Sequence, residues 1–376
     1  MVKRKLMNIL LSVMKWLLLA AVVLAAAGWA FVTWHPVFGG KPDAASLAKI
    51  QASPQFDGRQ FNNAEPTAMN TATGEQPSML AWLTSVVSPP PGKHPAEPLP
   101  SVQPDFAHLQ NGDFAWLGHS TVLFKIDGKT LITDPVFYRA SPIPIAGSPF
   151  PLTHTPKTAD LPVLDAVLLS HDHYDHLDYR AIKEIAPKAA HFYVPLGVKA
   201  HLQRWGIADD KITELDWHES AKLGDITFTL TPARHFSGRN FNNRFSTLWG
   251  SWVVKAPDLA LFFNGDSGYG KHFAAIGEQY GPFDLALMEN GAYNENWALI
   301  HMTPEQSVQA AQEVRASAVM PVHWAKFDLA YHGWKEPIER FMSAAEGKPL
   351  QTATPKIGEV FHIERLPQER WWESVK

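Results

Sequence analysis

Short runs in which apolar and polar residues alternate recur along the chain from about residue 114, and they predict a series of β-strands. The alternation is clearest at 226–231, where every second residue is apolar. Strands predicted at 121–126 and 129–133 flank Asp127-Gly128, a dipeptide typical of β-hairpin turns. A short helix is predicted over 179–185. This mixture of strands and short helices indicates an α/β domain.

The N-terminal hydrophobic pattern is continuous instead of alternating. An uninterrupted apolar run extends from Trp16 to Val32 and closes with Trp34, and it is preceded by Lys3, Arg4, Lys5 and Lys15. Its length falls within the range of about 17–25 residues that cross a bilayer. The flanking positive charge predicts that the N-terminus is cytoplasmic and that the rest of the chain lies outside.

A cleaved signal peptide is the alternative interpretation, because Ala25-Ala26-Ala27 offers small residues in a cleavage-like context. Apolar residues continue as far as Trp34, which favours a retained anchor. We therefore predict that residues 1–36 are a membrane anchor (or signal peptide). The predicted location is a bacterial-type inner membrane, spanned once, with the remaining chain on the periplasmic or extracytoplasmic side.

Residues 37–104 are rich in proline, which fixes φ and removes a backbone donor. We predict an extended, irregular arm that connects the anchor to the following domain and lies on its surface. One helical segment is predicted within the arm, over 77–87. The regularly patterned domain occupies residues 105–376.

A dense group of potential metal ligands directly follows the apolar run 166–169. In an extended segment alternate side chains share a face, so His171 and His173 can bind one cation together. Asp175 and His176 then turn away and can reach a second cation nearby. Imidazole and carboxylate groups suit borderline divalent ions, and they make zinc the default metal.

Ligand-type residues also follow three other predicted strands. His235 follows the strand at 226–231, Asp266 follows the apolar run 259–264, and His323 follows the run 318–322. If these strands are neighbours, all seven groups converge along one sheet edge. His119 and Asp134 lie beside strand ends and are predicted to orient the ligands. The histidines expected to have no ligand role are His94, His108, His154, His191, His201, His218, His272 and His332.

Composition and charge exclude several function classes. The formal net charge is −4 and the basic residues are scattered, so no basic footprint for nucleic acid is present. The chain contains no cysteine, which excludes disulfides, thiolate ligands and a cysteine nucleophile.

The motifs together resemble the metallo-β-lactamase fold superfamily, and within it the N-acyl-phosphatidylethanolamine-hydrolysing phospholipase D group. The core of the resemblance is the segment 170–178, which reads Ser-His-Asp-His-Tyr-Asp-His-Leu-Asp. Further stretches that carry it are 58–63, 116–121, 133–135, 233–239, 248–252, 263–269, 291–293 and 322–324. The resemblance covers about residues 56–337, and the chain departs from it at Met288-Glu289-Asn290.

The resemblance implies an αββα sandwich with a dinuclear metal site on its upper edge and a hydroxide between the two ions. It assigns His171, His173 and His235 to the first metal. It assigns Asp175, His176 and His323 to the second metal, with Asp266 as the bridge. His301 matches a histidine that helps to bind phosphate, and it precedes a helix predicted to begin with a capping box of Thr303 and Gln306. Asp266, Asp175 and His301 are thus the expected catalytic residues.

These features predict a membrane-anchored hydrolase with two divalent ions, most simply a phosphodiesterase of phospholipase D type acting on N-acyl-phosphatidylethanolamine-like lipids. One alternative is a lactonase or other ester hydrolase on the same site, and a second is a non-catalytic envelope protein that retains the fold. Four tryptophans near the ligand segments either line an acyl groove or belong to the core: Trp249, Trp252, Trp297 and Trp324. The expected partners are a lipid or ester substrate and the membrane, and the oligomeric state stays open.

Overall fold

The computed structural model describes residues 2–72, 89, 91–240 and 242–375, and over these residues the strands form two sheets of seven. The first has the order β14-β1-β2-β3-β4-β5-β6, and the second has the order β13-β12-β11-β10-β9-β8-β7. The strands of the first sheet are β1 (Asp113–Trp116), β2 (Val122–Ile126), β3 (Lys129–Thr133), β4 (Leu164–Leu168), β5 (Ala189–Pro195), β6 (Ile212–Leu215) and β14 (Val360–His362). Those of the second are β7 (Ser220–Leu223), β8 (Ile226–Thr231), β9 (Ser251–Lys255), β10 (Ala260–Phe263), β11 (Phe283–Glu289), β12 (Ala316–Val322) and β13 (Gln351–Thr352).

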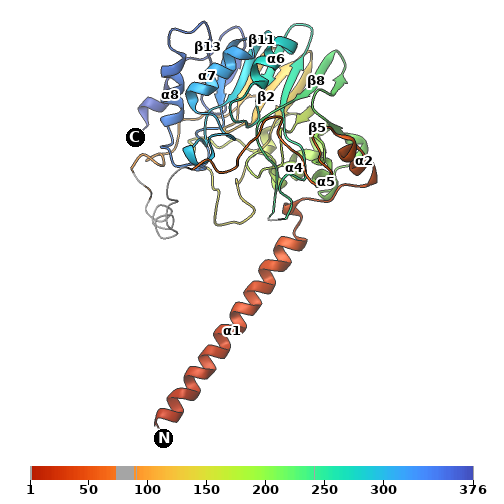
Figure 1. Cartoon of the computed structure of the whole chain (residues 1–376). Helices are drawn as coiled ribbons and strands as arrows, with labels where there is room; N and C mark the ends of the chain where they lie inside the picture. The colour runs from red at the N-terminus through yellow and green to blue at the C-terminus, as the bar shows by residue number, and fades with distance from the viewer. Residues whose placement is uncertain (1, 73–88, 90, 241, 376) are drawn as a thin grey trace.

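Helices cover the outer face of each sheet (Figure 1). The helices are α4 (Tyr179–Ile185) and α5 (Lys199–Arg204) on the first sheet, and α6 (His272–Tyr280), α7 (Pro304–Glu313) and α8 (Glu336–Ala345) on the second. The central strands are apolar on both faces: in β4, Ala166 and Leu168 pack between the sheets, whereas Val167 packs toward the helices. This burial on both faces explains the continuous apolar run. The predicted αββα sandwich is confirmed.

Strand directions bring the predicted ligand segments to one edge. Strands β3 to β6 run parallel to one another, as do β10 to β12, and β8 runs in the same direction as β10 because both are antiparallel to β9. Hydrogen bonds join the sheets at this edge, including Gly250 N–H to Ser170 O at 3.0 Å. Gly265 has a φ of +61°, and a Cβ there would lie 2.6 Å from the Ser170 side chain. Only glycine therefore allows the segment before Asp266 to approach so closely.

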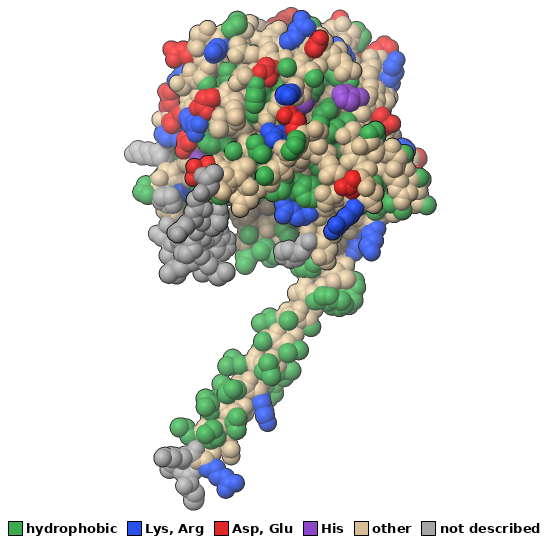
Figure 2. All heavy atoms as spheres, viewed as in Figure 1, with side chains coloured by type: hydrophobic (Ala, Val, Ile, Leu, Met, Phe, Trp, Pro, Cys, Tyr) green, Lys and Arg blue, Asp and Glu red, His purple; other side chains and the backbone are tan. Residues whose placement is uncertain are grey.

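The N-terminal helix α1 (Val2–Trp34) projects away from the domain, and its apolar side chains are exposed (Figures 1 and 2). It is long and apolar enough to be a candidate membrane span. The chain then passes through the short helices η1 (Pro36–Phe38) and α2 (Ala44–Ala52). Helix α2 was not predicted from the proline-rich sequence. Asp43 caps its N-terminus, because the Asp43 carboxylate accepts a hydrogen bond from Ser46 N–H.

The proline-rich region makes specific contacts with the domain. The Ser46 hydroxyl donates a hydrogen bond to Glu214 at 2.8 Å, and Phe61 N–H donates one to Phe245 O at 2.9 Å. The side chain of Asn63 donates to His235 O at 2.8 Å. The helix predicted over 77–87 lies outside the described residues.

Candidate metal centre

The loop after β4 is shaped by a buried carboxylate. Asp134 accepts hydrogen bonds from Ser170 N–H at 2.8 Å and from the Ser170 hydroxyl at 2.5 Å. The same side chain lies 2.7 Å from Nδ1 of His176. It therefore contacts both ends of the segment 170–176, and with Nδ1 of His176 bound in this way, Nε2 is the ring nitrogen left for the centre.

Three histidine nitrogens form the first ligand group. Nε2 of His171 lies 2.9 Å from Nδ1 of His173, and Nε2 of His235 lies 3.2 Å from the same atom. Tetrahedral zinc with bonds of about 2.0–2.1 Å holds neighbouring ligand nitrogens about 3.4 Å apart. The spacing of these three atoms therefore suits a single cation.

The second group contains Asp175, His176 and His323. Oδ2 of Asp175 lies 3.5 Å from Nε2 of His176 and 3.4 Å from Nε2 of His323. Nε2 of His119 lies 3.0 Å from the same carboxylate oxygen, which orients Asp175. His119 also accepts a hydrogen bond through its backbone carbonyl from His323 N–H at 3.0 Å, so it contacts two residues of this group.

Asp266 lies between the two groups. Its Oδ2 is 3.1 Å from Nε2 of both His176 and His323, and 3.9 Å from Nε2 of both His171 and His235. The structure thus brings all seven predicted ligands together. Within the described part of the chain, the eight histidines expected to have no ligand role lie outside these groups.

Several buried atoms of the centre have no hydrogen-bond partner in the protein. They are Nε2 of His176, Nε2 of His323 and Oδ1 of Asp266. Buried polar atoms are nearly always paired, so these unpaired atoms, two of which lie 3.1 Å from Oδ2 of Asp266, call for an additional group. A bound cation would satisfy this need, and the residues present fit a metal site.

Burial and neighbouring charges shift the pKa values of the candidate ligands in different directions. Burial, together with the neighbouring imidazoles, lowers the pKa of His171 and of His235 well below the usual value. Burial opposes ionisation of Asp266 and Asp175, but nearby imidazoles, His176 first, outweigh it and hold the pKa of both carboxyls well below their usual range. Burial likewise opposes protonation of His176, but these two carboxylates raise its pKa well above the usual value. A bound cation would therefore displace the proton of His176.

A second layer of contacts, which the sequence did not reveal, holds the ligand loop from behind. The buried guanidinium of Arg239 donates hydrogen bonds to Asp172 O at 2.6 Å and to Leu177 O at 2.9 Å. The Asp172 carboxylate lies 3.1 Å from Nε2 of His201. His201 thus acts on the loop without being a ligand. Arg239 lies in a motif of the family resemblance, but nothing in its spacing predicted these partners.

His301 lies at the centre's open side, before α7. Helix α7 begins with the predicted capping box of Thr303 and Gln306. Nδ1 of His301 is hydrogen-bonded to Glu289, which is fully buried at the end of β11. Glu289 lies in the tripeptide where the chain departs from the family pattern, and the sequence alone did not assign it a role.

A cavity of about 340 Å³ opens onto the ligands. His173, Asp175, Asp266, His301 and His323 lie in its wall. The other lining residues are Met69, Phe236, Arg244, Ala292, Trp297, Ile300 and Leu329. Of the four tryptophans considered for an acyl groove, Trp297 lines this cavity, whereas the other three are buried in the core.

Comparisons with known proteins agree with this geometry. A family model described as the beta-lactamase superfamily domain matches residues 129–324. An uncharacterised protein of Mycobacterium tuberculosis is 42% identical over 363 residues, covering 93% of this chain and 96% of that protein. N-acyl-phosphatidylethanolamine-hydrolyzing phospholipase D 1 of Caenorhabditis elegans is 36% identical over 287 residues, covering 70% of this chain and 80% of that protein.

A solved structure shows the same fold. A metallo hydrolase from the archaeon Ignicoccus hospitalis has a TM-score of 0.51 at 21% identity, covering 66% of this chain and 97% of that chain. The family model and the nematode relative, together with the clustered ligands, establish the assignment. The chain therefore belongs to the metallo-β-lactamase superfamily, as a metal-dependent hydrolase that resembles the N-acyl-phosphatidylethanolamine-hydrolysing phospholipase D group.

Proposed function

We propose that the chain is a membrane-anchored dinuclear hydrolase, a phosphodiesterase of phospholipase D type that acts on N-acyl-phosphatidylethanolamine-like lipids. The position of Asp266 carries the proposal, because one carboxylate oxygen faces both ligand groups at 3.1 and 3.9 Å. A carboxylate in this position can bridge two cations, which two-metal hydrolases hold about 3.5–4 Å apart. The nematode relative supports the substrate class.

Two divalent ions, with zinc as the default, would supply hydroxide at neutral pH and stabilise negative charge on a phosphoryl oxygen. His171, His173 and His235 would hold the first ion. Asp175, His176 and His323 would hold the second, with Asp266 between the two. His119 and Asp134 would keep the second group in place through their hydrogen bonds to Asp175 and His176.

The cavity wall supplies the remaining interactions. Because Nδ1 of His301 is occupied by Glu289, Nε2 is the ring nitrogen left to bind a phosphoryl oxygen. Arg244 adds positive charge in the same cavity, with its guanidinium 4.9 Å from the Phe236 ring centre. Met69, Trp297 and Leu329 offer apolar surface for an acyl chain.

In the proposed reaction, the bond between phosphorus and the ethanolamine oxygen breaks. The oxygen of water stays on phosphorus and gives phosphatidic acid. The ethanolamine oxygen takes up a proton and leaves as N-acylethanolamine. Positive charge from the bound ions and Arg244, together with a hydrogen bond donated by Nε2 of neutral His301, would favour the transition state because these groups stabilise the negative charge that develops there.

The test uses the full chain loaded with zinc in detergent micelles containing N-acyl-phosphatidylethanolamine, with Asp266→Asn as the control. We expect release of phosphatidic acid by the wild type and its loss in the variant. Two bound metals without this release would overturn the lipid assignment, and turnover of a lactone panel would then identify the ester-hydrolase alternative. A chain that binds no metal would support the non-catalytic alternative and overturn the enzyme proposal.

A further inference from the structure

Residues 139–149 form a loop with an exposed apolar tip. The tip is Ile143-Pro144-Ile145, in which Ile145 is 91% exposed and Ile143 is 42% exposed. The loop is closed at its base, because Ala140 N–H donates to Gly147 O at 2.9 Å and the Arg139 guanidinium donates to the Ser148 hydroxyl. The tip is thus held away from the core by a hydrogen-bonded base, and removing its isoleucines from water would be favourable.

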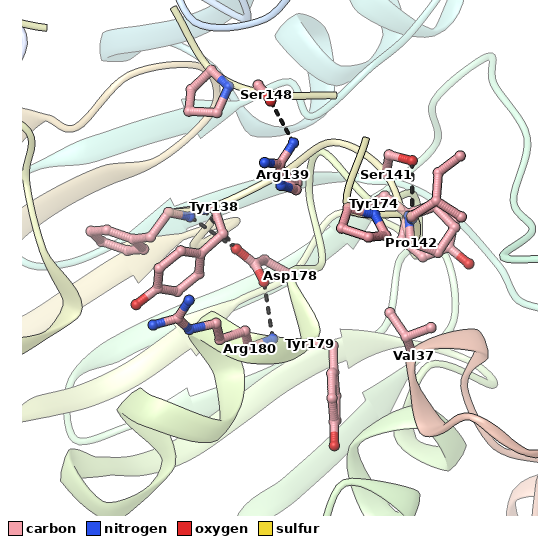
Figure 3. A pocket seen from close by; sticks show the side chains of 14 residues that line it. Val37, Tyr138, Arg139, Ser141, Pro142, Ser148, Tyr174, Asp178, Tyr179 and Arg180 are labelled. Carbon is pink, nitrogen blue, oxygen red and sulfur yellow. Dashed lines mark hydrogen bonds between the residues drawn. The ribbon is translucent and has the colours of Figure 1, made fainter. Parts of the chain in front are cut away.

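The tip lies beside the point where α1 joins the domain. A cavity of about 500 Å³ is lined by Ile143 and Pro144 of the loop and by Val37, three residues beyond the end of α1 (Figure 3). Tyr174 and Tyr179 line the same cavity. The loop and the beginning of the domain therefore share one surface region.

Residues 35–40, here called the exit segment, are bonded firmly to the domain. Pro36 O accepts a hydrogen bond from the Trp205 ring at 2.6 Å, and Val37 O accepts one from Arg239 at 2.9 Å. Gly40 N–H donates to His201 at 3.0 Å. These bonds hold the first residues after α1 against the domain, so that only a short segment separates the end of the helix from the domain surface.

Tryptophans on α1 indicate where the water–lipid boundary would lie. At about 1.5 Å per residue, Trp16 and Trp34 are separated by about 27 Å along the helix, close to the hydrocarbon thickness of about 30 Å. Trp29 and Trp34 are exposed, with ring centres 5.2 Å apart, and such exposed tryptophans gather at headgroup level. Val37 and the neighbouring loop tip therefore lie near this level.

The same surface is close to the metal centre. Tyr174 and Asp178 of the ligand loop line the cavity beside the tip, whereas His173 and Asp175 line the cavity over the ligands. One short loop thus separates the two cavities. A domain whose tip touches the bilayer would hold its metal centre next to the lipid surface.

We propose that Ile143-Pro144-Ile145 inserts into the headgroup–acyl boundary of the bilayer that α1 spans. Together, α1 and the loop tip form two contacts with one membrane and fix the tilt of the domain. This inference rests on the membrane anchoring of the proposed function, but not on the identity of the reaction. Apolar elements of this kind lie about 5–10 Å deep in the boundary region.

The absence of cysteine makes a direct test possible, because one introduced cysteine takes a single fluorescent label. Three full-length variants, Ile145→Cys, Leu24→Cys and Val163→Cys, would carry a polarity-sensitive dye in phosphatidylethanolamine–phosphatidylglycerol vesicles. Leu24 is an exposed residue of α1 and reports on the anchor. Val163 is the matched control, because it is a 73% exposed β-branched residue just before β4, at the opposite end of that strand from the ligand loop.

We expect the emission maximum of the label at position 145 to shift to shorter wavelength. Lipids that carry a nitroxide near the headgroup should quench its fluorescence. The label at position 163 should keep the emission of a water-exposed dye, and the label at position 24 should be quenched by nitroxides deep in the bilayer. If position 24 is quenched and position 145 behaves like position 163, the loop contact is wrong while the anchor stands. If position 24 is not quenched, both the anchor and this inference are wrong, and hydrolysis in detergent micelles is unaffected by either result.

Discussion

Glu289 and His301 are joined by a hydrogen bond between a carboxyl oxygen and the ring nitrogen Nδ1. The other oxygen of Glu289 accepts a hydrogen bond from Ser267 N–H at 2.8 Å, next to Asp266. Burial raises the pKa of Glu289 well above the usual value and lowers the pKa of His301 to about 4, so the neutral form of each group is favoured. A neutral carboxyl group donates to Nδ1 and leaves the ring proton on Nε2, toward the cavity.

The first prediction concerns Glu289 as a positioning residue. Glu289→Gln should retain most of the activity, because its amide oxygen accepts from Ser267 and its amino group donates to Nδ1. Glu289→Leu loses both bonds and should lower kcat by about 10–100-fold, the usual cost of removing such a support. Steady-state kinetics over a range of pH, with zinc content measured for each variant, test this. If the glutamine variant falls as far as the leucine variant, the function needs a charged carboxylate and our assignment is wrong.

Asp134 provides the second prediction. Asp134→Asn weakens the bond that orients His176 and should lower affinity for the second metal about 10–100-fold. Competition with a zinc-binding dye measures this affinity. Asp258→Asn, which changes an exposed carboxylate, is the control and should bind zinc as the wild type does. Equal affinities in all three proteins would show that Asp134 serves folding alone.

The clustering of the seven candidate ligands could be predicted from sequence because its signals are local. Strand patterning located the ends of β4, β8, β10 and β12, and ligand-type residues followed each one. Helix α4 has the predicted bounds, and the hairpin turn at Asp127-Gly128 has positive φ at both residues. Comparison with relatives also confirmed the family resemblance.

The contacts that Arg239 and His201 make with the ligand loop and the exit segment could not be predicted, because their partners are distant in sequence. Gly40 and His201 are 161 residues apart, and Arg239 and Val37 are 202 residues apart. Such contacts depend on the packing of the whole fold and leave no local pattern. Tryptophan is equally ambiguous, since the core residue Trp252 and the cavity residue Trp297 each follow a polar residue and precede apolar ones.

Metal removal gives the third prediction. Chelation should leave the unpaired atoms of His176, His323 and Asp266 buried without partners, so it should lower the melting temperature. At a free metal concentration 100 times the Kd, binding stabilises the fold by about 2.7 kcal/mol per site. Thermal unfolding with and without chelator, beside elemental analysis, tests this. The wild type should hold two metals and Asp266→Asn fewer, and an unchanged melting temperature would contradict the proposed centre.

The fourth prediction concerns Arg239. Arg239→Met removes the hydrogen bonds to the carbonyls of Asp172, Leu177 and Val37 and leaves these groups without that donor. The free energy of unfolding should fall by about 2–5 kcal/mol, because unsatisfied buried groups carry a large desolvation cost. Denaturant titration measures the change. Arg180→Met, which breaks an exposed bridge to Glu184, is the control and should change stability by less than about 1 kcal/mol.

The last prediction separates a cavity tryptophan from a core tryptophan. Trp297 lines the cavity over the ligands and is only partly buried, so Trp297→Ala should remove apolar surface from the substrate site. If the substitution removes about 1.4 kcal/mol of apolar contact with the substrate, kcat/KM should fall about tenfold. The loss should be larger for long-chain than for short-chain N-acyl substrates, while the melting temperature stays near that of the wild type.

Trp252→Phe, in the core between the sheets, should instead lower the melting temperature and leave chain-length preference unchanged. An equal loss of kcat/KM for both chain lengths in Trp297→Ala would place the acyl chain elsewhere in the cavity.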